Sequence, residues 1–268
     1  MEQAIEYFTV FGGLDEQIDT TIPIEKSIEE LILDEYKYYR NQVADLCTSD
    51  PLLQAILSGV ALGDRRTNSA FRRAQVSFKN GMECVDELRD MGVLKVESTM
   101  HHLTNQANQG DISKKLIITT PFLRFWFAFV SPIFKGIRDG DYKEFFTNFK
   151  NQKEEFQNYI FEQLCHEYVK KQFQEDSIYS DGRYWDDEGE IELVAKTTSG
   201  KIIAGSCKYT NAKMKKSVLT NLKKECEDIQ LPVDIFVLFA KSGFSSELKS
   251  LKSEELRLFT AKSLKALI

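Results

Sequence analysis

The stretch from 183 to 209 sets the strongest limit on the fold of this chain. Two short apolar runs flank a Ser-Gly pair there, which predicts a β-hairpin with strands over 190–196 and 201–209. Side chains alternate between the two faces of a strand, so Glu190 and Glu192 share one side of the first strand. If this side coincides with the side of the second strand that carries Lys208, Glu192 and Lys208 converge.

Glu190 is on the same predicted face as Glu192, and Ser206 is on the same face as Lys208. Carboxylates beside a lysine are what metal-dependent phosphodiester cleavage needs, because carboxylate oxygens hold Mg²⁺ and a lysine orients or deprotonates the attacking water. A surface hairpin with Glu and Lys facing solvent is the commonest explanation of such a pattern. The residues alone leave both interpretations open.

The hairpin resembles the PD-(D/E)XK nuclease core found at the C-terminus of archaeal-type ATPases. That family tends to have the pattern W…EIDIVA…GECKW, and this chain has Trp185, EIELVA over 190–195 and GSCKY over 205–209. An upstream predicted helix carries Phe161-Glu162, similar to a Phe-Glu pair of the family. The resemblance implies a restriction-nuclease-like α/β domain with a mixed sheet over 154–268.

The resemblance implies catalytic roles for Glu162, Glu190, Glu192 and Lys208, with Glu162 and Glu192 as metal ligands. Glu192 stands where the family has aspartate, and Ser206 stands where it has its second catalytic acid. A neutral hydroxyl cannot replace a carboxylate on a divalent cation, so metal affinity falls unless Glu190 or Glu162 supplies the ligand. We therefore expect a degenerate site without a cofactor, and the alternative is an active Mg²⁺-dependent nuclease.

Residues 121–132, PFLRFWFAFVSP, place Phe122, Phe125, Trp126 and Phe129 at helical spacing, which predicts a buried core helix. The same ATPase family carries a similar run between its winged helix and its nuclease-like domain. The resemblance divides the chain into four parts: a helical lid-like segment over 1–50, a winged helix over 51–120, connecting aromatic helices over 121–153 and the nuclease-like domain. The P-loop core of the family is absent, because no G-x-x-x-x-G-K-[ST] motif occurs, so we do not expect ATP hydrolysis.

The winged-helix prediction rests on three helices followed by two strands. The expected helices cover 51–62, 68–74 and 80–91, the last capped by Asn80, and the strands cover 93–98 and 115–120 around a polar tip at 99–114. The third helix carries mainly acids, which makes it a poor reader of the major groove and favours a protein-packing face.

The formal net charge of −6 argues against indiscriminate nucleic-acid binding. Basic residues nevertheless concentrate in 51–80 and in 201–268, so any nucleic-acid contact is expected there. The candidate contacts are Arg65, Arg66, Arg72, Arg73, Lys213, Lys215 and Lys216. Solvated charge on helix faces explains the same runs equally well.

The remaining patterns predict an α/β fold combined with an all-α N-terminal region. A helix is expected over 24–39, a long one over 142–173 with a break near Asn151, and one over 213–229, followed by a buried strand at VDIFVLFA, a short helix and a last strand. The five cysteines are widely spaced and predict reduced thiols. The chain has neither a secretory signal nor an apolar run long enough for a membrane span, so we expect a cytoplasmic protein.

These observations favour a non-catalytic or weakly active module that binds DNA or a protein, such as a separate P-loop ATPase. An active metal-dependent phosphodiesterase is the alternative. The two hypotheses differ in whether the carboxylates of the hairpin hold a metal ion.

Overall fold

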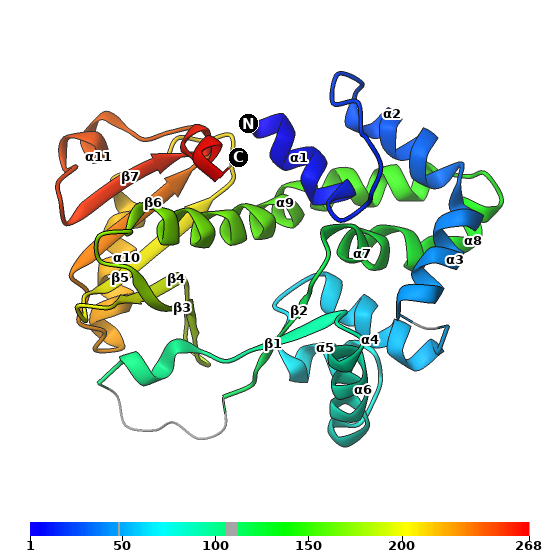
Figure 1. Ribbon diagram of the computed structural model, residues 1–268, viewed down its shortest axis with the longest axis horizontal. Helices are drawn as coiled ribbons and strands as arrows, with labels where there is room; N and C mark the ends of the chain where they lie inside the picture. Colours follow the sequence, from blue (N-terminus) through cyan, green and yellow to red (C-terminus); the bar gives the residue numbers. More distant parts are fainter. Residues whose placement is uncertain (48, 106–111, 268) are drawn as a thin grey trace. The chain divides into compact units, whose positions relative to one another are not determined.

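The computed structural model describes residues 1–47, 49–105 and 112–267, which form two compact units. We call them the sheet unit, which comprises Met1–Glu2, Ser98–Ile112 and Gln157–Ile268, and the helical unit, which comprises Gln3–Glu97 and Ser113–Phe156. Figure 1 shows the sheet unit with its strands β3 to β7 and the mainly helical remainder. The predicted fold class, a helical N-terminal region followed by an α/β part with a mixed sheet, is confirmed.

The sheet unit is organised around one five-stranded sheet of order β3-β4-β5-β6-β7. Its strands are β3 (Ile178–Trp185), β4 (Glu190–Thr197), β5 (Ile202–Lys208), β6 (Ile235–Ala240) and β7 (Leu256–Thr260). The pairs β3-β4 and β4-β5 are antiparallel, and β5-β6 and β6-β7 are parallel. β6, which has a parallel partner on each side, is a continuous apolar run, IFVLFA, as expected for a strand covered on both faces.

Helices cover both faces of this sheet. Leu238 of β6 belongs to an apolar cluster with Leu222 of α10 (Lys216–Asp228). The next residue along β6, Phe239, contacts Tyr168 of the long helix α9 (Lys143–Gln172) with 5.9 Å between ring centroids. Because neighbours on a strand point to opposite faces, α10 and the C-terminal half of α9 lie on opposite sides of the sheet. The chain then closes with α11 (Ser246–Ser250), β7 and η5 (Ala261–Leu267).

The helical unit consists of short helices around one apolar core. Its first elements are α1 (Glu2–Phe11), α2 (Ile24–Ile28), the π-helix η1 (Glu29–Leu33) and α3 (Tyr36–Cys47). Next come α4 (Pro51–Ala61), α5 (Thr67–Arg73), α6 (Phe78–Asp90) and the antiparallel strands β1 (Leu94–Glu97) and β2 (Lys115–Ile118). The last are α7 (Pro121–Phe125), the π-helix η3 (Trp126–Val130), η4 (Ser131–Ile133), α8 (Phe134–Arg138) and the first half of α9 (Lys143–Gln172).

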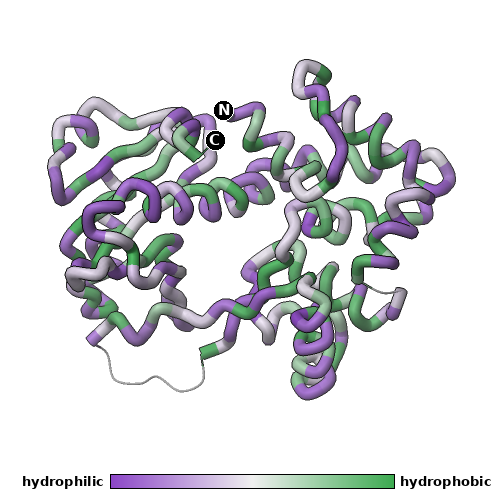
Figure 2. The backbone as a smooth tube through the Cα atoms, viewed as in Figure 1, coloured by the Kyte–Doolittle hydropathy of each residue, from purple (hydrophilic) through white to green (hydrophobic). Residues whose placement is uncertain are grey.

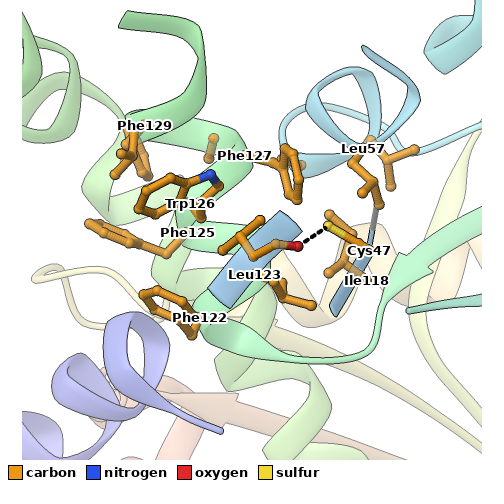
Figure 3. Packing of buried hydrophobic residues seen from close by; sticks show 14 of the residues in the cluster. Cys47, Leu57, Ile118, Phe122, Leu123, Phe125, Trp126, Phe127 and Phe129 are labelled. Carbon is orange, nitrogen blue, oxygen red and sulfur yellow. Dashed lines mark hydrogen bonds between the residues drawn. The ribbon is translucent and has the colours of Figure 1, made fainter. Parts of the chain in front are cut away.

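The aromatic segment is buried, as its spacing predicts. Phe122, Phe125, Trp126 and Phe129 each expose 4% of their surface or less. Figure 3 shows these rings together with aliphatic side chains such as Leu57 in one packed core. Edge-to-face ring contacts dominate this core and stabilise it beyond the area that it buries.

Several local predictions need correction. Ser77 caps α6 by accepting a hydrogen bond from the Asn80 backbone N–H at 3.2 Å, so Asn80 is not the cap. α9 continues unbroken through Asn151. The helix expected over 24–39 is interrupted, because the π-helix η1 separates α2 from α3. β3 was not expected, because its sequence contains turn-favouring residues.

The polar tip predicted at 99–114 contains a short 3₁₀-helix, η2 (Met100–Leu103). Met100 is buried in the apolar cluster of the sheet unit, and the Trp185 backbone N–H donates to the Thr99 hydroxyl at 3.0 Å. The first part of the tip therefore packs on the sheet unit. Residues 106–111 of the tip lie outside the described residues.

α9 is 30 residues long, and Figure 2 shows hydrophilic and hydrophobic residues alternating along it. That alternation fits a helix packed on one side and solvated on the other. In the described part of the chain, no helix combines the length and the apolar character needed to cross a membrane.

Arg124 connects two helices inside the helical unit and provides a test of its core. The guanidinium is 4% exposed, donates to the carbonyl oxygens of Ala61 at 3.1 Å and Phe156 at 3.0 Å, and lies 3.9 Å from the centroid of the Phe156 ring. We expect Arg124→Ala to lower the free energy of unfolding by about 2–4 kcal/mol, because it removes buried hydrogen bonds and leaves a cavity. Urea unfolding would measure this loss. The exposed Arg72→Ala is the matched control, with an expected change within about 0.5 kcal/mol, and equal losses in the two variants would contradict the assigned role.

Candidate functional site

The residues of the hairpin line a cleft of about 170 Å³ in the sheet unit. The cleft lies between the strands β4 and β5 and the helix α10. Its polar lining consists of Glu190, Glu192, Ser206, Lys208, Asn221 and Glu225. The side chain of Ser206 is buried, whereas Glu190 and Glu225 are exposed. Glu192 and Lys208 therefore do share a face, and it opens toward α10.

Glu192 accepts hydrogen bonds from three donors at the end of β5. Its Oε2 accepts from the Ser206 hydroxyl at 2.7 Å and from the Cys207 backbone N–H at 2.8 Å. Its Oε1 forms an ion pair with the Lys208 ammonium group. Both carboxylate oxygens are thus occupied by groups of the chain itself.

Strand register explains why Glu192 meets these donors. Leu193 pairs with Gly205, so the residue before Leu193 lies beside the residue after Gly205. Gly205 also lets β5 approach β6 closely, because an added Cβ would lie 2.6 Å from a methyl group of Val237 and 2.8 Å from its carbonyl oxygen. A larger residue at 205 would displace the strand that carries the donors.

Lys208 stays protonated in this environment. Burial lowers the pKa of the Lys208 ammonium group, but the charges of Glu192 and Glu162 and the hydrogen bond to Glu192 raise it more, so the net shift is upward. An ammonium group at neutral pH can orient a substrate or a water molecule, but it cannot remove a proton from water. Lys208 as placed is therefore a cation and not a general base.

Glu162 has a partner of its own. It is 7% exposed, its Oε1 accepts from the Asn158 side-chain amide at 2.6 Å, and its Oε2 lies 3.5 Å from Arg183 Nη2 on β3. Arg183 is itself 5% exposed. Glu162 and Glu192, the two predicted metal ligands, thus each face a cation of the chain: Arg183 for Glu162 and Lys208 for Glu192. Such ion pairs compensate the charge of a carboxylate without a metal ion.

His166 fixes the strand that carries Glu192. Its Nε2 lies 2.9 Å from the backbone carbonyl oxygen of Glu192, and its Nδ1 lies 3.2 Å from Oδ2 of Asp181. Lys170 lies 3.2 Å from the other oxygen of Asp181. The imidazole therefore joins α9 to β3 and β4 behind the carboxylate of Glu192.

The donor set does not fit a magnesium ion. Mg²⁺ requires several carboxylate or carbonyl oxygens with free lone pairs in near-octahedral positions. Here Glu192 and Glu162 are held by cations and amide donors, and Ser206 directs its hydrogen at Glu192. Among residues 1–47, 49–105 and 112–267, no three His, Cys, Asp or Glu side chains come together in a way that could hold a metal ion.

Glu225 is a member of the cleft that sequence reasoning missed. It is on α10 and lines the same space as Glu192 and Lys208. Burial raises the pKa of the Glu225 carboxyl, and the charge of Glu192 raises it further. The only sequence signal is that Glu225 follows Leu222 by three residues on an amphipathic helix, which places both at the same edge. Arg183 and Asp181 were missed as well, because β3 itself was not predicted.

The structure divides the predicted nucleic-acid contacts between the two units. Arg73 is occupied, because its guanidinium donates to the carbonyl oxygens of Gly59 at 2.8 Å and Leu62 at 3.0 Å near the end of α4. Arg72 is exposed, and Arg65 and Arg66 are half-buried at the start of α5. In the sheet unit, Lys213, Lys215 and Lys216 are exposed where the chain enters α10, and Lys216 forms an ion pair with Glu247 at 3.1 Å.

Residues 126–221 match the model of the DUF234 family, described as archaea bacterial proteins of unknown function. The matched segment runs from η3 through α9 and the antiparallel strands β3, β4 and β5 into α10, so it contains Glu162, Glu192, Ser206 and Lys208. No curated protein and no solved structure matched the chain. The comparison therefore links the site to a family without assigning it a chemistry.

The contacts of Asp181 predict a loss of stability in acid. Burial raises the pKa of the Asp181 carboxyl, but the hydrogen bonds and charges of His166 and Lys170 outweigh burial and leave the pKa below its ordinary value of 3.8. A carboxyl whose folded pKa is depressed stabilises the fold above the unfolded pKa, and this contribution disappears as the pH falls through the folded pKa. We expect Asp181→Asn to unfold at lower urea concentration at neutral pH, with a difference from the natural protein that shrinks below about pH 4.

Urea unfolding at a series of pH values would measure this difference. Glu227→Gln, at an exposed position of α10, is the matched control and should change little at any pH. A difference for Asp181→Asn that stays constant down to about pH 2 would contradict the assigned electrostatic origin.

Proposed function

We propose that the chain is a non-catalytic interaction module that derives from the C-terminal part of an archaeal-type ATPase and keeps a degenerate PD-(D/E)XK nuclease-like site. The observation that carries this proposal is the saturated carboxylate of Glu192, which accepts from Ser206, Cys207 and Lys208. The resemblance of the hairpin and of the aromatic run to that ATPase family supports the origin. The missing P-loop supports a module that does not hydrolyse ATP by itself.

Ser206 is stronger support for loss of the nuclease reaction than an absent acid alone, because the serine also changes the contacts of Glu192. An acid at this position would place a second negative charge next to Glu192, and a divalent cation would have to compensate both. Ser206 instead donates a hydrogen bond to Glu192 at 2.7 Å, so the pair is stable without an ion. In this proposal, the role of the site is to stabilise the pairing of β4 with β5.

Two partner classes fit an interaction role. DNA is supported by the exposed lysines Lys213 and Lys215, because a duplex is bound chiefly through its phosphates. A protein partner is supported by α6, whose exposed face carries mainly acids, and a separate P-loop ATPase is the protein that the family resemblance suggests. The cytoplasm is the proposed location.

An active metal-dependent nuclease is the second candidate, and one observation favours it. Glu190, Glu192 and Glu225 line the same cleft as Lys208, although in the described part of the chain they do not come together as a metal-binding group. In this second candidate, Glu190 or Glu225 takes the place of the missing acid. The ion pairs described above weigh against it.

Metal binding and DNA cleavage distinguish the two candidates. We expect no saturable binding of Mg²⁺ or Mn²⁺ in calorimetry and no nicking of supercoiled plasmid by the natural protein, because its carboxylates are already compensated. Ser206→Glu restores the second acid and should gain metal binding, whereas Ser246→Glu, at an exposed position of α11, should not. Metal binding and nicking by the natural protein that both disappear in Glu192→Ala would replace our proposal with the active nuclease.

The lysines before α10 give a separate test of the DNA partner. Lys213→Ala combined with Lys215→Ala should weaken binding to duplex DNA of any sequence and lower the slope of log K against log salt by about 0.9 for each phosphate that the double variant no longer neutralises. Fluorescence anisotropy over a salt series would measure both quantities. Lys249→Ala with Lys252→Ala is the control of equal charge change at exposed positions of the same unit. Equal effects of the two double variants would show that the lysines before α10 form no specific contact.

A further inference from the structure

The helical unit contains a cavity of about 400 Å³ that is separate from the cleft at Glu192. It lies between the turn after α1, the helix α3, the end of α6 and the segment that joins β2 to α7. Its lining consists of Gly13, Leu14, Asp15, Glu16, Tyr38, Tyr39, Gln42, Leu46, Met91, Gly92, Val93, Thr119, Thr120, Phe122 and Leu123. All of these residues belong to one compact unit, so the cavity is a property of that unit alone.

The lining combines aromatic rings with acids. The rings of Tyr38 and Tyr39 are nearly perpendicular, with centroids 5.1 Å apart, and the ring of Phe122 lies 5.3 Å from that of Tyr39. Asp15 and Glu16 contribute carboxylates, and no lysine, arginine or histidine among the described residues lines the cavity. Tyr39 and Phe122 are each 2% exposed, so the accessible aromatic face is that of Tyr38, which is 50% exposed. An aromatic face and carboxylates both attract organic cations, so the lining is complementary to an ammonium or guanidinium group.

A hydrogen bond holds Glu16 in place. Its Oε1 accepts a hydrogen bond from the Tyr39 hydroxyl at 2.8 Å. Burial, followed by this hydrogen bond, raises the pKa of Tyr39, so the phenol remains the donor. Within the described residues, neither Asp15 nor Glu16 forms an ion pair with a basic side chain of the chain, in contrast to Glu162 and Glu192.

Large apolar side chains surround the cavity and remain exposed. Tyr38 is 50% exposed, Leu46 55% and Met91 42%. A small cation would fill the polar part and leave these side chains in water. An amphipathic peptide would cover them as well, because it presents apolar and basic residues on neighbouring positions.

We propose that this cavity docks a basic amphipathic segment of a protein partner. A lysine or arginine of that segment lies against the exposed ring of Tyr38 and the carboxylate of Glu16, and its apolar residues pack on Leu46 and Met91. The partner is a protein, so the inference rests on the interaction role proposed above. It does not depend on whether the site at Glu192 is active, and peptide binding tests it separately from metal binding and nicking.

The test uses labelled peptides as defined probes for the full chain. The first peptide has leucine and lysine at helical spacing, the second replaces every lysine with glutamate, and the third replaces every leucine with serine. Fluorescence anisotropy would measure their binding to the natural protein. We expect the leucine-lysine peptide to bind, and we expect each of the other two to bind at least about tenfold more weakly, because each lacks one half of the complementary chemistry.

Substitutions then locate the binding. Tyr38→Ala and Glu16→Gln should each weaken the leucine-lysine peptide by about tenfold, since they remove an aromatic face or a charge. Tyr179→Ala and Glu144→Gln are controls at exposed positions outside the cavity and should leave binding unchanged. Circular dichroism establishes that each variant is folded, and Leu46→Ala supplies a second, purely apolar test at a surface position.

Three results would overturn the proposal. The first is absence of binding by the leucine-lysine peptide, and the second is binding that Tyr38→Ala, Glu16→Gln and Leu46→Ala all leave unchanged. The third is tight binding of tetramethylammonium that depends on Tyr38 and displaces the peptide, because that result assigns the cavity to a small cation and not to a protein. Binding that requires both the rings and the apolar rim supports the docking of a protein segment.

Discussion

The carboxylate of Glu192 is the interaction on which the sheet unit depends. It accepts from the hydroxyl of Ser206 and the backbone of Cys207 and pairs with Lys208, while His166 contacts the carbonyl oxygen of the same residue. One glutamate thereby joins β4, β5 and α9. A half-buried acceptor with several donors resists movement, because a buried donor such as the Ser206 hydroxyl that is left without it costs about 1–3 kcal/mol. These contacts fix the position of the carboxylate relative to the three elements.

The same contacts set the competition that any metal ion would face. A divalent cation near Glu192 would have to displace the Lys208 ammonium group and at least one hydrogen bond from β5. The binding of the ion would itself release less free energy, because the ion would lose water ligands and would meet the hydroxyl of Ser206 and not a carboxylate. The basic residues of the site therefore oppose metal binding through charge as well as through occupancy of the oxygens.

Strand alternation was sufficient to predict that Glu190 and Glu192 share one side of β4 and that Ser206 and Lys208 share one side of β5, because period two is a property of every strand. That the two sides coincide depends on the register of β4 with β5, which alternation alone does not give. Alternation was not sufficient for β3, whose Ser180, Asp181 and Gly182 favour turns. β3 forms because it pairs with β4, with two register shifts along its length. The sequence therefore did not predict that Asp181 and Arg183 of β3 belong to the site, and it did not predict the ion pair between Glu162 and Arg183. Tertiary pairing overrode local preference at this strand.

The cleft at Glu192 and the cavity of the helical unit differ in whether the chain itself supplies cations to their carboxylates. Glu162 and Glu192 each face a cation of the chain, so the charges of these carboxylates are compensated without a ligand. Asp15 and Glu16 stand beside aromatic rings and exposed apolar side chains, and no basic residue lines their cavity in the part of the chain that the structure describes. Exposure to water stabilises these carboxylates in the free protein, and a cation that arrives with apolar neighbours gains both the charge interaction and the burial of Tyr38, Leu46 and Met91. The cavity of the helical unit therefore has more to gain from a bound partner than the cleft of the sheet unit.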